Sequence, residues 1–181
     1  MGNRLTKIYT RTGDEGSTGL ADGRRVAKTS PLLELIGEVD ELNSHIGVLR
    51  AAAEDAAVDS LLSEIQHDLF DLGGELAIDG AEAITATRVA FLERAIDRYN
   101  DDLPPLQEFV LPAGNTAAAV CHVARAVARR VERRAHAVQA PGDLGIQGRA
   151  YLNRLSDLLF VLARTLARRD GGAEVTWNRS R

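Results

Sequence analysis

Apolar side chains recur every three or four positions along most of this chain, with polar residues between them. This period predicts helices, because it places the apolar positions on one face, whereas a half-buried strand alternates with a period of two. Five such segments follow one another. They predict five helices, over about residues 31–49, 58–76, 87–99, 115–138 and 145–169.

Cap and turn residues separate these helices. Ser30 and Pro31 suit the N-cap and the first position of the first helix. Prolines end the third helix at 104–105, and Pro141 with Gly142 separates the fourth from the fifth. The sequence therefore predicts an all-α, antiparallel five-helix bundle in a single domain. Its expected parts are a glycine-rich loop at 1–29, the bundle at 30–170 and a tail at 171–181, with at most a short strand at 175–177.

The first two predicted helices carry further signals. On the flank of the first, a stripe of small or short polar side chains lets another backbone approach closely, and Asp40 lies in this stripe with Gly37, Ser44 and Gly47. The second helix is weakened near its end by the glycines at 73–74. The apolar side chains that we expect to face inward from the second helix are Leu61, Leu62, Ile65, Leu69, Phe70 and Leu72.

Composition narrows the class of protein. A chain of 181 residues can bury a full core in one domain, and its 45% hydrophobic but only 4% aromatic residues suit helices. The single cysteine, Cys121, excludes an internal disulfide framework and fits a reducing compartment, so we expect a cytoplasmic protein. No apolar run approaches the roughly 18 residues of a membrane span. The net charge of −4 argues against a general binder of nucleic acid or membrane surfaces.

The segment at 10–19 has the composition of an anion-binding loop. Gly13, Gly16 and Gly19 can adopt positive φ, which lets successive backbone N–H groups converge on an anion. Arg11 and Lys28 supply positive charge, and no Walker A or dinucleotide-binding pattern is present. An ordinary glycine-rich loop ahead of a helix remains the alternative. The hydroxyl donors of the loop are Thr10, Thr12, Ser17 and Thr18.

A second candidate site lies on the fourth predicted helix. A row of Arg125, Arg129 and Arg133 is self-repulsive unless anions compensate it, and Glu132 compensates only part. A solvated charged face is the alternative, but a polar cluster at 151–157 of the fifth helix favours a ligand site. Arg130 and Arg134 point elsewhere on the helical projection. The side chains that share one arc of about 100° are His122, Arg125, Arg129, Glu132, Arg133 and His136.

No protein nucleophile or metal cluster can be assembled from the sequence. The residues of a Ser/His/Asp set, a Cys/His pair or a His/Glu metal site do not occur at suitable spacings. Cys121 stands among apolar neighbours, and we interpret it as inert packing. The histidines are scattered, and we interpret each as a surface or packing residue: His45, His67, His122 and His136.

Five blocks of the sequence closely resemble the PduO-type ATP:cob(I)alamin adenosyltransferases. They occur in the order and at the separations of that family, at 10–16, 38–43, 109–112, 125–134 and 151–159. The resemblance implies a homotrimer of five-helix bundles that binds ATP and the corrinoid at subunit interfaces. It also implies transfer of the 5′-deoxyadenosyl group of ATP to cob(I)alamin, with release of triphosphate.

The resemblance further implies the roles of individual residues. Asp40 and Arg125 match a pair that bridges neighbouring subunits, and Phe109 matches a residue that crowds the lower face of the corrin. Ala113 stands where the family often has glycine. The catalytic residues implied are Arg129, Phe109, Asp40 and Arg125. The ATP-binding residues implied are Thr10, Arg11, Thr12, Gly13, Asp14, Gly16, Ser17, Thr18, Gly19, Lys28, Arg129, Glu132, Arg133 and Asn153.

The chemistry implied by the resemblance agrees with the lack of a nucleophile. A cobalt(I) centre attacks carbon unaided, so the protein has to orient ATP, neutralise the leaving triphosphate and shape the axial face of the cobalt. We expect Mg²⁺ with the phosphates, and its protein ligands stay open. The partners implied besides ATP are cob(I)alamin or cob(II)alamin, an electron-donating reductase and an adenosylcobalamin-dependent acceptor enzyme.

Two other classes of function remain open at this point. An ATP-sensing regulatory helical module would bind ATP but form no product with reduced corrinoid. A plain interaction bundle would dock an acidic partner on its basic helix, and ATP would not protect it against heat.

Overall fold

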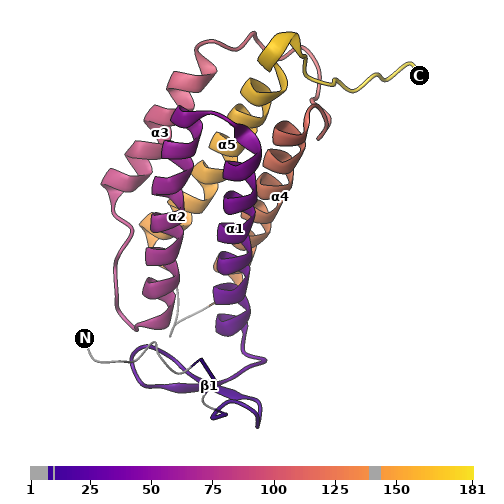
Figure 1. Ribbon diagram of the computed structural model, residues 1–181. Helices are drawn as coiled ribbons and strands as arrows, with labels where there is room; N and C mark the ends of the chain where they lie inside the picture. The colour runs from indigo at the N-terminus through magenta and orange to yellow at the C-terminus, as the bar shows by residue number, and fades with distance from the viewer. Residues whose placement is uncertain (1–7, 10, 139–143) are drawn as a thin grey trace.

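Five helices account for most of the chain in the computed structural model, which describes residues 8–9, 11–138 and 144–181 (Figure 1). A two-stranded hairpin precedes them, and a short 3₁₀ turn follows the last helix. The expected helices are confirmed, with ends that shift by a few residues. The elements are β1 (Ser17–Gly19), β2 (Arg25–Ala27), α1 (Pro31–Ala53), α2 (Ala56–Ala77), α3 (Ala86–Asn100), α4 (Thr116–Ala137), α5 (Ile146–Ala167) and the 3₁₀ turn Arg169–Gly171.

Side-chain caps fix where three of the helices begin. The hydroxyl of Ser30 accepts the amide of Leu33 at 3.2 Å, with proline at the first position of α1 as the sequence predicts. Asp55 caps α2 and Asn115 caps α4 in the same way. Each of these side chains satisfies a backbone N–H that the helix itself leaves unpaired.

The second helix ends close to its predicted end. α2 passes through the glycines at 73–74 and continues to residue 77, one residue beyond the prediction. The predicted separator at 141–142 lies outside the described residues.

The helices run up and down beside one another (Figure 1). α4 packs against both α1 and α5, α1 packs against α2, and α3 packs against α5. The β1–β2 hairpin lies at the end of the bundle where α1 begins, and the C-terminal segment lies at the opposite end (Figure 1). The bundle therefore separates the glycine-rich loop from the turn that precedes α4. No helix in the described part of the chain is long and apolar enough to cross a membrane.

The core confirms the predicted apolar faces with one exception in α2. Leu35 and Leu42 of α1 and Leu62 of α2 are fully buried. Phe70 is predicted to face inward, but its side chain is 78% exposed. Phe70 lies about 100° around the helix from Leu69, which takes it past the edge of the buried face.

The hairpin is an element that the all-α prediction missed. β1 and β2 pair antiparallel, with Thr18 opposite Val26. Each strand has only three residues, too short for a period of two to stand out. At the other end of the bundle, the expected terminal strand is a single antiparallel bridge between Val110 and Thr176.

Candidate functional site

The glycine-rich loop is a defined turn. The amide of Gly16 donates to the carbonyl of Gly13 at 3.3 Å, and the amide of Lys28 donates to the carbonyl of Gly16 at 2.8 Å. Gly16 has φ of +81°, in the left-handed region that favours glycine. Gly13 and Gly19, in contrast, do not have positive φ. The shape of the loop therefore depends on Gly16, and only this one of the three glycines uses the conformational freedom expected of them.

Lys28 lies against this turn, although it follows the hairpin in the sequence. A Cβ added at Gly13 would lie 3.2 Å from Nζ of Lys28 and 3.2 Å from the carbonyl oxygen of Ser17. Because glycine has no side chain, position 13 leaves room for the ammonium group of Lys28. The structure therefore brings together the predicted loop and the predicted cation.

Arg25 is a member of this region that the sequence reasoning missed. Its Nη2 donates to the carbonyl of Thr12 at 2.8 Å and to the hydroxyl of Ser17 at 2.6 Å. Because the Ser17 oxygen accepts this bond, its own proton remains available to a ligand. Residues 25–27 alternate polar and apolar after Gly23, but three residues are too few to indicate a strand from sequence alone.

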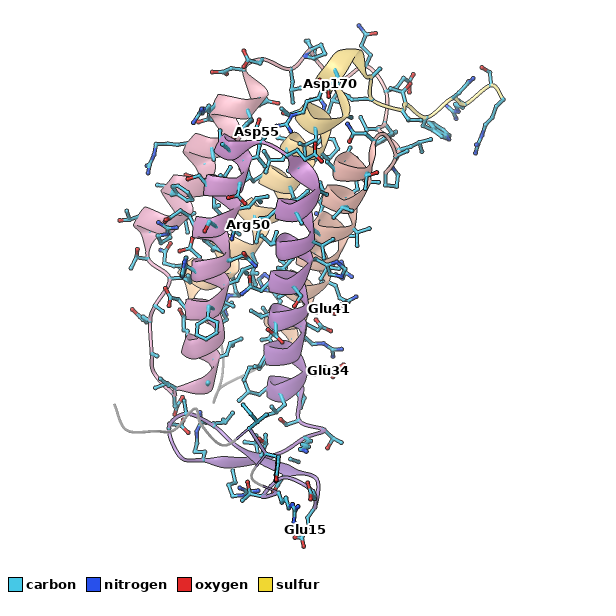
Figure 2. All side chains as sticks on the ribbon, in the orientation of Figure 1. Glu15, Glu34, Glu41, Arg50, Asp55 and Asp170 are labelled. Carbon is cyan, nitrogen blue, oxygen red and sulfur yellow. The ribbon has the colours of Figure 1, made fainter. Side chains whose placement is uncertain are left out.

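The loop presents its charged side chains to solvent. Arg11 has φ of +59°, which is uncommon for a residue with a Cβ, and its guanidinium lies 5.4 Å from the ring centroid of Tyr9. Asp14 is exposed, and Figure 2 shows Glu15 at the tip of the loop, away from the helices. Thr10, the first of the predicted hydroxyl donors, lies outside the described residues.

Arg129 and Arg133 form an exposed cationic pair on α4. Nη1 of Arg133 donates to the carbonyl of Arg129 at 3.0 Å. Within the described ranges, neither guanidinium forms an ion pair with a carboxylate, so no described side chain compensates their repulsion. This pair has the charge and the exposure that an anionic ligand requires.

Arg130 and Arg134 point elsewhere, as predicted. Nη2 of Arg134 donates to Glu34 at 2.8 Å, and Arg130 pairs with Glu41. Figure 2 shows Glu34 and Glu41 along the same side of α1. Both contact arginines of α4. These two arginines therefore hold α4 against α1.

Glu132 and Asn153 are brought together across α4 and α5. Nδ2 of Asn153 donates to Oε1 of Glu132 at 3.0 Å. The next residue of α5, Arg154, donates from Nε to Glu93 of α3 at 3.0 Å. Glu132 and Asn153, which the sequence assigned to one site, thus contact each other. The side-chain amide of Asn153 fixes the carboxylate of Glu132, the residue before Arg133.

His122 does not belong to the exposed polar arc. The predicted arc included it, but its side chain is buried at 3% exposure, and its ring lies 6.4 Å from that of Phe160. Burial and the neighbouring Arg125 lower the pKa of His122. α4 packs against both α1 and α5, so its buried face is wider than one apolar stripe and takes in this histidine.

Phe109 and Arg125 line one cavity at the far end of the bundle from the loop. The cavity has a volume of about 440 Å³ and also includes Phe160 and Leu106. The Phe109 side chain is 78% exposed, so it is not a core residue. Nε of Arg125 lies 3.4 Å from Nδ1 of His122, and Arg125 has no carboxylate partner among the residues described. An aromatic ring and a cation without a counter-charge among the described residues thus line one opening.

Asp40 lies on a different face of the molecule. It borders an apolar groove of about 450 Å³ between α1 and α2, whose walls include Ile36, Leu69 and Phe70. Asp40 is exposed, and its carboxylate has no hydrogen-bond or ion-pair partner within the part of the chain that the structure covers. The structure does not bring Asp40 and Arg125 together within one chain.

The predicted cations of α4 form a row along the axis of the bundle. The contact between Arg134 and Glu34 places that turn of α4 beside the first turn of α1, directly after the loop. Because a helix rises about 1.5 Å per residue, Arg125 lies about 12 Å farther along the axis than Arg133, in the direction of the Phe109 turn. A ligand on this row would reach from the loop end toward the Phe109 cavity.

Metal ligands are scarce in this region. No group of three or more His, Cys, Asp or Glu side chains that could hold a metal ion occurs among residues 8–9, 11–138 and 144–181. Cys121 is buried, and burial raises the pKa of its thiol well above the usual value, which agrees with its interpretation as inert packing. The site offers charge, hydroxyls and an aromatic ring, which suit binding and orientation of a ligand.

Two solved structures share this fold and indicate a class of nucleotide-using transferase. A phenylalanine-to-alanine variant of a PduO-type ATP:corrinoid adenosyltransferase from Lactobacillus reuteri, complexed with cobalamin and ATP, matches with a TM-score of 0.88 at 30% identity. The match covers 96% of this chain and 100% of that chain. An arginine-to-lysine variant from the same organism, complexed with ATP, gives a TM-score of 0.88 at 31% identity over 94% of this chain and 100% of that one.

Sequence comparison identifies the family. The family described as cobalamin adenosyltransferase matches residues 8–166. A cobalamin adenosyltransferase of Cupriavidus metallidurans is 54% identical over 182 residues, which cover 100% of this chain and 99% of that protein. A corrinoid adenosyltransferase of Mycobacterium leprae is 46% identical over 98% of each chain. This chain belongs to the cobalamin adenosyltransferase family, and the resemblance drawn from the five sequence blocks is confirmed.

Proposed function

We propose that this protein transfers the 5′-deoxyadenosyl group of ATP to cob(I)alamin, forming adenosylcobalamin and releasing triphosphate. The observation that carries this conclusion is the 54% identity, over the whole chain, to a cobalamin adenosyltransferase. The similarity to a PduO-type enzyme complexed with cobalamin and ATP supports both substrates.

The reaction balances without a protein nucleophile. The electron pair of cobalt(I) forms a bond to C5′ of ATP while the bond between C5′ and its oxygen breaks. Triphosphate leaves with that bonding pair, and cobalt passes formally from +1 to +3. The chain has to position the two substrates and neutralise the leaving group. The site fits this role, because it has cations and an aromatic ring, and Cys121 is buried with a raised pKa.

The phosphate end of the proposed site is the glycine-rich loop with α4. Lys28 and Arg11 supply charge at the loop, and the hydroxyls and amides around Gly16 supply donors. Arg129 and Arg133 face solvent without carboxylate partners in the described chain, which leaves them available to the triphosphate. The proposed remaining ligands are Thr10, Thr12, Gly13, Asp14, Ser17, Thr18, Gly19, Glu132 and Asn153.

Magnesium is the metal that we propose with ATP. Mg²⁺ is usually held by substrate phosphates, waters and one or two carboxylates rather than by a full protein cage. The exposed carboxylate of Asp14 lies on the same loop as the proposed phosphate ligands, so it suits this mode of binding. A bound Mg²⁺ would neutralise part of the charge of the triphosphate.

The cobalamin end of the proposed site is the cavity at Phe109. An exposed aromatic ring can occupy the lower axial side of the corrin and displace the lower ligand. A four-coordinate cobalt(II) centre lacks the axial donor that favours the higher oxidation state, so it is easier to reduce to cobalt(I). The 78% exposure of Phe109 supports this role over packing.

A homotrimer would complete the site between subunits. Asp40 and Arg125 lie on different surfaces, and neither has an oppositely charged partner within the described chain. An ion pair between Asp40 of one subunit and Arg125 of the next would satisfy both charges. The apolar groove beside Asp40 would be covered in the same contact.

Two further partners follow from the chemistry of the reaction. Cobalt(II) must gain one electron before it can attack ATP, so we propose an electron-donating reductase. The product is a cofactor, so we propose an adenosylcobalamin-dependent enzyme as its acceptor.

A cytoplasmic location would provide the reducing conditions that the free Cys121 fits.

The proposed activity is tested by anaerobic incubation with ATP, Mg²⁺ and chemically reduced cobalamin. We expect the light-sensitive absorption spectrum of an alkylcobalamin to develop only when all components are present. ATP should also raise the melting temperature, because ligand binding stabilises the folded state. Thermal protection by ATP without an alkylcobalamin product would instead indicate an ATP-sensing module.

A further inference from the structure

A carboxylate anchors the C-terminal segment to the end of α5. The side chain of Glu174 is 8% exposed and lies between two arginines, with Arg164 Nε at 3.1 Å and Arg168 Nε at 2.8 Å. Burial raises the pKa of Glu174, but the hydrogen bonds and the charges of Arg168 and Arg164 together outweigh this effect, and the pKa lies below its usual value. Glu174 is therefore a charged anchor at neutral pH.

The same anchor reaches the connection between α3 and α4. Nη2 of Arg164, whose side chain is 4% exposed, donates to the carbonyl of Pro104 at 2.7 Å. Pro104 lies in the connection that carries Phe109. The guanidinium of Arg164 thus contacts both the C-terminal segment and the connection that carries Phe109. This contact lies at the end of the bundle where the C-terminal segment leaves α5 (Figure 1).

Beyond the anchor, the C-terminal segment pairs with the Phe109 turn. The amide of Leu111 donates to the carbonyl of Val175 at 2.8 Å, and the amide of Trp177 donates to the carbonyl of Phe109 at 2.7 Å. These bonds flank the isolated antiparallel bridge. They fix the register that places Trp177 beside Phe109.

The two aromatic rings meet edge to face. Their centroids are 6.4 Å apart and their planes are inclined by 66°. Trp177 supplies the one ring–ring contact of Phe109 within the described ranges. Because the Phe109 side chain is 78% exposed, little else restricts its rotamer.

We propose that the C-terminal segment sets the orientation of Phe109 toward the corrinoid, with Trp177 as a positioning residue and Glu174 as its anchor. This inference rests on the proposed function, since it concerns how Phe109 performs its role there. An edge-to-face aromatic pair shifts a rotamer equilibrium by about three- to tenfold. Trp177 therefore increases the fraction of molecules in which the ring is ready to displace the lower ligand of cobalamin.

The contact itself can be tested without substrates. Trp177 is the single tryptophan of the chain, so its fluorescence reports on this position alone. We expect Phe109→Ala to shift the emission of Trp177 to longer wavelength, because the indole is then more hydrated, while the melting temperature stays near that of the wild type. An unchanged emission spectrum would show that the rings do not meet in solution and would overturn the inference.

The positioning role is tested with Trp177→Ala, its conservative partner Trp177→Phe, and Arg179→Ala as a control in the exposed tail. In the presence of ATP and cob(II)alamin, Trp177→Ala should reduce the four-coordinate cobalt(II) signal in electron paramagnetic resonance by about three- to tenfold. Trp177→Phe should restore most of the signal, and Arg179→Ala should leave it unchanged. The rate from chemically reduced cob(I)alamin should stay within about twofold in all three, because the ring contact acts before reduction.

Glu174→Gln gives a second, independent perturbation. It should weaken the anchor and lower the same signal, with a matching shift in Trp177 emission. A full four-coordinate signal in Trp177→Ala would overturn the positioning role. Failure of the wild-type protein to form adenosylcobalamin would instead overturn the proposed function, and the ligand-free fluorescence result would still decide whether the contact exists.

Discussion

At the scale of the residue, the arginines of α4 divide into two kinds. Arg130 and Arg134 are paired with carboxylates of α1, whereas Arg129 and Arg133 have no such partner in the described chain. Adjacent residues of the same type have different environments because they lie about 100° apart on the helix. The arginines without carboxylate partners are therefore the ones that we assign to the triphosphate.

Replacement of Arg129 should weaken the interaction with ATP. In Arg129→Ala, we expect the loss of a charged hydrogen bond to cost about 1.5–3 kcal/mol, or roughly ten- to 150-fold in kcat/KM for ATP. Arg134→Ala is the matched control on the same helix. It removes the ion pair with Glu34 and a longer one with Glu38, which Arg130 also contacts, so it should affect the packing of α4 on α1 and leave ATP binding intact.

The measurement for this prediction is steady-state kinetics with ATP as the varied substrate, together with direct binding. If Arg129→Ala and Arg134→Ala both had the affinity and rate of the wild type, Arg129 would not belong to the site.

Phe109 should matter for reduction of cobalt and little for folding. Truncation of a buried phenylalanine costs about 3–5 kcal/mol, but the exposed side chain of Phe109 leaves no cavity behind. We therefore expect Phe109→Ala to keep a near-normal melting temperature and ATP affinity. Its reaction from cob(II)alamin should be slow, and its four-coordinate cobalt(II) signal should disappear.

Leu106→Ala is a suitable control for Phe109→Ala, because Leu106 lines the same cavity and is 51% exposed. Electron paramagnetic resonance and thermal melting, performed on both variants, separate the two roles of the ring. An intact signal with a collapsed melting temperature in Phe109→Ala would assign the ring to structure.

At the scale of the element, caps and ion pairs determine how the helices are joined. Asp55 caps α2 by accepting the amide of Val58 at 2.8 Å, and its carboxylate also pairs with Arg169 after α5. Figure 2 shows Asp55 at the connection between α1 and α2. One carboxylate thus ties the start of α2 to the end of α5.

The contribution of Asp55 to stability should depend on pH. The backbone hydrogen bond from Val58, and to a smaller extent the charge of Arg169, lower the pKa of Asp55 despite its desolvation. Because the pKa is lower in the folded state, this contribution is fully present above the unfolded value of about 3.9 and is lost as pH falls through the folded pKa. At pH 7, Asp55→Ala should cost about 0.5–2 kcal/mol through loss of the cap.

Denaturant unfolding of the wild type and Asp55→Ala across the range from neutral to acidic pH checks this expectation. The difference between the two should shrink once pH falls below about 4. Asp55→Asn keeps a cap acceptor but no charge, so its stability relative to Asp55→Ala should not depend on pH. A difference between the wild type and Asp55→Ala that stayed constant into acid would contradict the role of the Asp55 charge.

The helices were predictable from sequence because each has a long apolar period, but the contacts at their edges were not. Phe70 and His122 lie at the borders of buried faces, where the outcome depends on which neighbour packs there. α4 contacts two helices and therefore buries His122, whereas α2 leaves Phe70 exposed beside a groove. The hairpin strand that carries Arg25 has too few residues for its periodicity to be recognised, and the short strand expected at 175–177 gave no indication of its pairing with the Phe109 turn.

At the scale of the whole molecule, the two ends of the bundle carry different parts of the proposed site. The loop end carries Lys28 and the glycine turn, and the opposite end carries Phe109 and the C-terminal segment. The loop and Lys28 were predicted as an anion site from their composition, and the role of Phe109 was implied by resemblance to a family, whereas the C-terminal segment was not assigned to a site. The separation between the loop and Phe109 along the bundle is a property that only the fold reveals.

Assembly should depend on Asp40 and Arg125, two charges that lack counter-charges among the described residues of a single chain. If Asp40 of one subunit meets Arg125 of the next, each single variant leaves a charge unpaired at the contact, whereas the double variant leaves none. We therefore expect the effects of Asp40→Ala and Arg125→Ala to be non-additive, with an interaction energy of about 0.5–3 kcal/mol.

Sedimentation of the wild type should give a homotrimer at micromolar concentration. The subunit affinities of the two single variants and of the double variant then give the interaction energy in a double-mutant cycle. Asp97→Ala, on the exposed face of α3, is the matched control and should not change the assembly. A monomeric wild type, or strictly additive effects, would be inconsistent with this interface.

The central claim is that a carbon–cobalt bond forms with loss of the whole triphosphate. The most direct measurement uses ATP labelled with ¹³C at C5′, incubated anaerobically with the protein, Mg²⁺ and cob(I)alamin. We expect a ¹³C signal of a carbon bound to cobalt, and intact triphosphate in equal amount by ³¹P spectroscopy. Formation of ADP and phosphate, with the label still in the nucleotide and no carbon–cobalt signal, would contradict it.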